Sequence, residues 1–154
     1  MLVSVYKHNI DQWHQDEDIR GLIEGLEGLS KPLTKEGRTE FKEELLKKIR
    51  GIGWSGKRKL FPSTSSISIS SIKDDIGMCI QLGNIARYYA DIVKLQHMHH
   101  SGSIREGVLI VYHLEAASRL FAGGGNLATY ERVMRELGLM SDSISFPITL
   151  IGIG

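Results

Sequence analysis

Residues 66–82 read SISISSIKDDIGMCIQL, and this stretch decides the fold. Residues 66–71 alternate polar and apolar side chains, and residues 76–82 are mostly apolar, so each segment is typical of a β-strand. Lys73, Asp74 and Asp75 lie between them and supply residues that favour a turn. The sequence therefore predicts a β-hairpin close to the middle of the chain.

Helical and extended patterns surround this hairpin on both sides. Their order, with helices before the hairpin and alternating helices and strands after it, predicts an α/β (α+β) protein with a mixed β-sheet flanked by helices. The predicted elements are a strand at 2–6, helices at 16–29 and 34–50, the hairpin, a helix at 84–98 capped by Asn84, a strand at 107–112, a loop at 123–125, a helix at 127–138 capped by Asn126, and a strand at 147–153.

Composition indicates an ordinary globular chain. Its 154 residues are 42% hydrophobic and 24% charged, which suits one domain over residues 1–154 and argues against disorder. No apolar run is long enough to span a bilayer, and the N-terminal residues lack the layout of a secretory signal. Cys79 is the single cysteine, so no internal disulfide can form. We therefore expect a cytoplasmic protein with no membrane partner.

The net charge of +1 hides a local excess of basic residues. Residues 34–59 hold nine basic and four acidic side chains, and the run Lys57-Arg58-Lys59 ends this segment. Because salt screens surface charges over about 8 Å, a local excess of this kind attracts phosphates even in a nearly neutral protein. The ordinary alternative is a solvated basic helix end followed by a loop.

The second hairpin strand has two different faces. Side chains alternate along a strand, so Ile76, Met78, Ile80 and Leu82 are predicted to point into a core. The opposite face is formed by Asp75, Gly77, Cys79, Gln81 and Gly83. It is either covered by a helix or left open as an active-site face, and periodicity leaves both alternatives open.

Several segments, taken in their order and spacing, resemble one known family. They are Val3–His8, Gly53-Trp54, Ile69–Gln81, Gly83-Asn84 with Arg87 and Asp91–Lys94, and Pro147–Ile153. This arrangement resembles the type II restriction endonucleases of the BglII and BstYI kind, which have the PD-(D/E)XK nuclease fold. The resemblance implies hydrolysis of DNA phosphodiester bonds with Mg²⁺ as the cofactor.

The resemblance also implies a catalytic set, from which this sequence departs. The family's Asp position falls on Ser70, its Glu position on Cys79, and its third polar position on Gln81, which would orient the attacking water. A hydroxyl is a weak ligand for Mg²⁺, and a thiol prefers softer metals. Asp75, or Glu44 (with its neighbour Glu43) on the second predicted helix, is therefore a candidate to hold the metal.

The implied partner is double-stranded DNA, bound by a homodimer whose two-fold axis suits a palindromic site. Expected phosphate-binding residues are Lys57, Arg58, Lys59, Arg87 and Lys94. Arg87 and Lys94 share a helix face, so either they face phosphates or they pair with Asp91. Because two carboxylates are missing, the alternative function is a nuclease fold without catalysis that binds DNA or a partner subunit.

Overall fold

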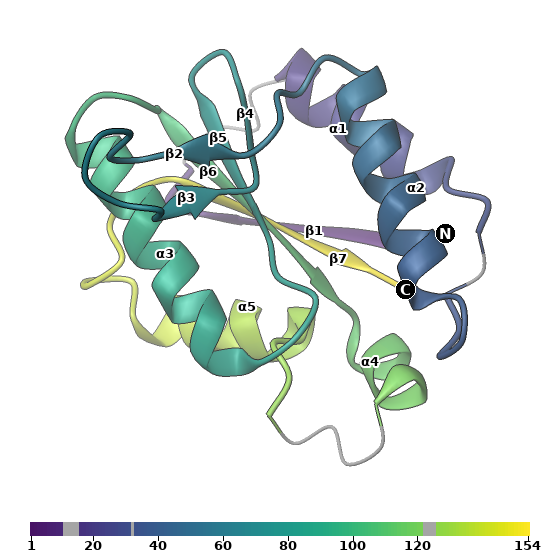
Figure 1. The fold of residues 1–154 in the computed structure, drawn as a ribbon. Helices are drawn as coiled ribbons and strands as arrows, with labels where there is room; N and C mark the ends of the chain where they lie inside the picture. Colours follow the sequence, from purple (N-terminus) through teal and green to yellow (C-terminus); the bar gives the residue numbers. More distant parts are fainter. Residues whose placement is uncertain (11–15, 32, 122–125) are drawn as a thin grey trace.

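The computed structural model describes residues 1–10, 16–31, 33–121 and 126–154, and its main feature is a mixed five-stranded sheet (Figure 1). The strand order is β1-β7-β6-β5-β4; the two inner pairs run parallel and the two outer pairs antiparallel. The strands are β1 (Val3–His8), β4 (Ser71–Lys73), β5 (Ile76–Ile80), β6 (Glu106–Tyr112) and β7 (Ile148–Ile153). A separate ribbon pairs β2 (Arg58–Lys59) with β3 (Ser68–Ile69).

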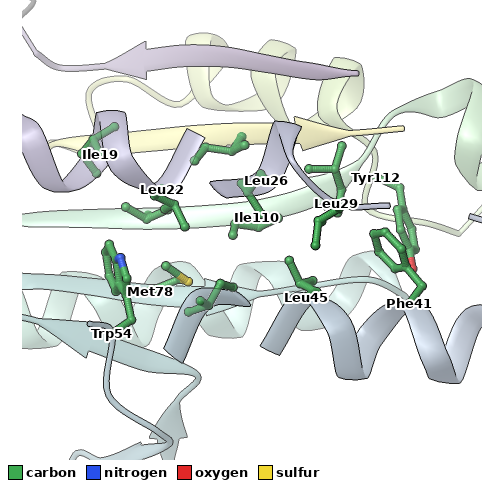
Figure 2. Packing of buried hydrophobic residues seen from close by; sticks show 14 of the residues in the cluster. Ile19, Leu22, Leu26, Leu29, Phe41, Leu45, Trp54, Met78, Ile110 and Tyr112 are labelled. Atoms are coloured by element: carbon green, nitrogen blue, oxygen red, sulfur yellow. The ribbon is translucent and has the colours of Figure 1, made fainter. Parts of the chain in front are cut away.

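Helices cover both faces of the sheet, as the alternation of apolar side chains along the strands requires (Figure 1). Helices α1 (Glu17–Glu27) and α2 (Arg38–Gly51) pack on one face, where Leu22 and Leu45 meet Met78 and Ile110 (Figure 2). Helices α3 (Ile85–His100) and α5 (Tyr130–Leu139) pack on the other. The short α4 (Leu114–Leu120) follows β6.

The predicted fold class is confirmed, and so is the central hairpin. Strands β4 and β5 pair antiparallel, with Asp74 at a positive φ of 48° in the turn between them. The predicted strand at 66–71 is in fact two strands, because β3 pairs with β2 whereas β4 pairs with β5, and Ser70 lies at the change of partner. Its backbone amide still donates to the Met78 carbonyl at 2.9 Å, so the position that corresponds to the family's Asp remains next to β5.

The prediction for the last helix was wrong at its N-terminus. Asn126 does not cap it; α5 begins at Tyr130 after Thr129. The preceding residues are extended because Leu127 bridges to Asn84 and Thr129 bridges to Tyr112. The predicted loop at 123–125 lies outside the described residues. Sequence reasoning also missed α4 and the β2–β3 ribbon, whose short elements carry little periodic signal.

One glycine shows how closely the layers approach. A Cβ atom built on Gly152 of β7 would lie 2.6 Å from the ring of Tyr130, so only glycine lets α5 pack on this strand.

Within the described part of the chain, no helix combines the length and apolar character needed to cross a membrane.

Candidate nucleic-acid interface

A cavity of about 550 Å³ opens at the end of β5, between α2 and α3. Figure 1 shows these two helices on opposite sides of the connection that leaves β5. Ser55, Gly56 and Lys57, which follow α2 in the chain, also line it, and the cavity continues along β3 through Ser68. We call this cavity the cleft.

The floor of the cleft comes from the hairpin. Ser70, Ile80 and Gln81 all line it, so the structure brings together two of the three positions that the family resemblance singled out. The Ser70 hydroxyl accepts a hydrogen bond from the backbone amide of Ile80 at 2.9 Å, and the backbone amide of Gln81 donates to the Ile110 carbonyl at 2.8 Å. These bonds fix the strand ends on which the polar side chains stand.

Cys79 lies behind this floor rather than on it. Its side chain is 1% exposed and packs with Tyr88 and Ile92 of α3. Burial, followed by the nearby carboxylate of Asp91, raises the pKa of the Cys79 thiol, so the thiol stays protonated and neutral. A neutral, buried thiol does not attract a hard dication. At Gly77 and Cys79 this strand face is therefore covered by a helix, and it opens toward the cleft at Gln81.

A buried carboxylate on α3 organises the polar end of the cleft. Asp91 is 7% exposed and lines the cleft. Its Oδ2 accepts a hydrogen bond from Gln81 Nε2 at 2.9 Å, and its Oδ1 lies 2.7 Å from Lys94 Nζ. Both oxygens of this carboxylate are thus already engaged.

The remaining charges of the cleft are positive. Four cations, Arg50, Lys57, Arg87 and Lys94, line it against the single carboxylate of Asp91. Among the residues that the structure describes, Arg50, Lys57 and Arg87 form no ion pair. Of the two predicted pairings with Asp91, only that of Lys94 is formed. The cleft therefore has a surplus of unpaired cations suited to anionic groups.

Two predicted metal ligands lie elsewhere. Asp75 is in the β4–β5 turn, at the opposite end of β5 from Gln81, where its carboxylate is 2.7 Å from the Arg105 guanidinium. The hypothesis that it shares a site with Gln81 was wrong because the strand separates the two residues by its whole length. Asp75 does not line the cleft.

Glu44 is also turned away from the cleft. Its carboxylate accepts hydrogen bonds from the Ser30 hydroxyl at 2.8 Å and from the Lys31 amide at 2.9 Å. The Ser30 hydroxyl, and then the Lys31 amide, lower the pKa of Glu44, which shows that the loop after α1 stabilises this charge. Glu44 thus ties α2 to that loop.

The basic run 57–59 is divided between two cavities. Lys57 lines the cleft, whereas Arg58 and Lys59 line a smaller cavity of about 190 Å³ beside the C-terminal part of α3. The two cavities are neighbours, because Ser68 of the cleft pairs with Lys59 of the smaller cavity in the β2–β3 ribbon. The basic surface therefore continues beyond the cleft.

The residues present do not fit a divalent metal. In the part of the chain that the structure describes, no group of three histidine, cysteine or acidic side chains is placed to hold one. At the family's positions stand a hydroxyl, a protonated thiol and an amide whose nitrogen faces Asp91. The one carboxylate that lines the cleft is held by the Gln81 amide and the Lys94 ammonium, and Lys94 is one of four cations in the lining. A hard dication needs several anionic oxygen ligands, and this cleft does not offer them.

Sequence reasoning missed two parts of the site. It treated Asp91 only as a pairing partner of Arg87 and Lys94 at helical spacing, although the residue is buried and bonded to Gln81. It did not single out Arg50, which reaches the cleft from the last turn of α2. The basic C-terminal turn of that helix was the available signal, but its direction depends on how α2 packs.

The mixed five-stranded sheet, covered by helices on both faces and with the cleft at the Gln81 end of β5, has the fold of the restriction endonucleases. Residues 9–153 match the family model described as restriction endonuclease BglII/BglIII, and the chain belongs to this family. The structure is similar to that of restriction endonuclease BglII complexed with a DNA 16-mer, with a TM-score of 0.71 and 16% identity over 99% of this chain and 76% of that one. Free BglII gives a TM-score of 0.69 and 15% identity over 100% of this chain and 80% of that one. No curated protein matches the sequence.

Proposed function

We propose that this protein binds double-stranded DNA in the cleft and does so without metal-dependent hydrolysis. The single observation that carries the proposal is the charge of the cleft: four lining cations against one carboxylate, which is itself paired. Family membership and the likeness to a DNA complex support DNA as the ligand. The loss of carboxylates at Ser70 and Cys79 supports binding rather than cleavage.

The electrostatics predict how this binding behaves. Each phosphate neutralised by a cation releases counterions, so the logarithm of the binding constant falls with the logarithm of salt by about 0.9 per contact. If all four cations contact phosphates, affinity drops on the order of 100-fold between about 50 and 200 mM salt. Fluorescence anisotropy of a labelled duplex in a buffer with a chelator measures this directly. Binding that does not change with salt, or no binding at all, would refute the proposal.

Catalysis is tested separately by plasmid cleavage. We expect no cutting with Mg²⁺ or Mn²⁺, and the Gln81→Ala variant serves as the control for contaminating nucleases. Metal-dependent cutting by the wild type that Gln81→Ala abolishes would show an active endonuclease and would contradict the non-catalytic part of the proposal. In that case Mg²⁺ would be the cofactor that the family resemblance implies.

The homodimer stays a prediction. It rests on the two-fold symmetry that palindromic DNA sites favour. Light scattering of the complex with a duplex is expected to give two chains for each DNA molecule. One chain for each duplex at saturation would exclude this arrangement.

A further inference from the structure

Among the residues that the structure describes, Asp91 and Lys94 form the one ion pair between side chains that line the cleft. The side chain of Asp91 is 10% exposed and that of Lys94 is 27% exposed. Gln81 holds the second carboxylate oxygen, so the carboxylate cannot turn without losing a bond. The Lys94 ammonium is therefore fixed at the polar end of the cleft by a buried anchor, unlike the exposed cations around it.

Lys94 still has donors to offer. An ammonium group carries three N–H donors, and within the described residues only Asp91 is bonded to it. The side chain lines the cleft and remains partly open to solvent. An oxygen of a phosphate group entering the cleft can accept one of the remaining donors while Asp91 keeps its own.

The ammonium lies at the end of the cleft where the family resemblance places the metal-dependent centre. It lies beside Gln81, the residue that the family's spacing places at the metal-dependent centre. An ammonium there supplies positive charge toward a phosphate without the anionic ligands that a dication requires. It also occupies the coordination space of the only carboxylate that lines the cleft in the described chain.

We infer that the Lys94 ammonium, positioned by Asp91 and Gln81, is a built-in phosphate-binding cation that stands where a nuclease of this family would hold its metal. This inference rests on the proposed function, because its ligand is a phosphate of the bound DNA. Asp91 and Gln81 act as positioning residues. The arrangement makes DNA binding independent of divalent cations.

The variant Lys94→Met tests this inference, because it keeps most of the apolar stem and removes the charge. The matched control is Arg135→Met, which removes an exposed cation of α5 outside the cleft. Anisotropy with a chelator present is expected to show roughly ten-fold weaker binding for Lys94→Met, the effect of losing one charged hydrogen bond. The slope of the logarithm of the binding constant against the logarithm of salt concentration should also become shallower by about one. The control should match the wild type.

A second measurement addresses the metal. Electron paramagnetic resonance detects Mn²⁺ bound to the protein. We expect no Mn²⁺ ion bound at Asp91 in the wild type, so the wild type and Asp91→Asn should give the same spectrum. The inference is overturned if Lys94→Met binds DNA with wild-type affinity and slope, or if the wild type holds an Asp91-dependent Mn²⁺ ion. If the wild type does not bind DNA at all, the proposed function fails instead, so the two failures are distinguishable.

Discussion

The two ends of strand β5 carry charged side chains in opposite balance. At the Asp75 end, Arg105 is shared by Asp75 and Asp16, and Lys73 lies 2.6 Å from Asp18. At the Gln81 end, four cations and one carboxylate line the cleft. Acids are thus in the majority at one end and cations at the other. Only the Gln81 end is therefore suited to a polyanion, although the sequence has aspartates near both ends.

The largest effect is expected when a carboxylate is returned to the cationic end. Cys79→Glu should destabilise the fold by more than about 3 kcal/mol, because the position is buried against α3 and the like charge of Asp91 acts on it more strongly than the opposite charge of Lys94. Urea denaturation measures the loss. The Cys79→Ala control should cost about 1 kcal/mol.

Wild-type stability of Cys79→Glu would mean that this strand face can open and accept a buried carboxylate. The covered face described for β5 would then be wrong.

The next effect separates the two ends by DNA binding. Arg87→Glu should weaken binding by about 10- to 100-fold, because a lining cation is replaced by an anion. Arg105→Glu changes charge by the same amount at the other end and should leave affinity within about two-fold at moderate salt. Anisotropy titrations of both variants on one duplex provide the measurement. Equal losses would show that DNA responds to overall charge and not to the cleft.

A smaller effect concerns stability at the Asp75 end. Arg105→Ala removes the partner of Asp16 and Asp75 and should cost about 1 kcal/mol or less, since the guanidinium is half exposed. Arg20→Ala is the matched control, because its guanidinium only approaches Glu17 and Glu24 at 3.9 and 4.0 Å. That control should show almost no change in thermal unfolding. A loss of several kcal/mol in Arg105→Ala would contradict this expectation and would show that the ion pairs at the Asp75 end of β5 are a main source of the protein's stability.

The smallest effect is a dependence on pH. Partial burial raises the pKa of Asp16, but hydrogen bonds from Arg105 and from backbone amides outweigh it, so this pKa lies below its ordinary value of 3.8. A lowered folded pKa contributes stability that is present above the unfolded value and is lost as pH falls through the folded value.

The stability difference between the wild type and Arg105→Ala should therefore be full at pH 7 and shrink as pH falls below about 3.8. Urea midpoints at pH 7 and pH 3 measure it. A difference that grows in acid would contradict the assigned direction.

The fold was largely predictable because its signals are local. Alternation in residues 66–82 gives the hairpin, and the spacing between Ser70 and Gln81 places both in the cleft once the two strands pair. The role of Asp91 was not predictable in this way. It depends on the rotation of α3 against the sheet, which the sequence of the helix does not specify.

The false candidates have a related cause. Asp75 shares a strand face with Gln81, but strand length separates them, and Glu44 lies on a helix whose other side faces the cleft. Periodicity identifies a shared face and does not tell which end of it meets a cavity. Tertiary packing supplied that information.

The most direct test is a crystal structure of the protein with a DNA duplex, soaked in Mn²⁺ and measured at a wavelength where Mn²⁺ scatters anomalously. We predict no anomalous peak between Gln81 and Asp91, and a DNA phosphate oxygen within hydrogen-bond distance of Lys94 Nζ. An anomalous peak coordinated by Asp91, with Lys94 displaced from it, would contradict the account.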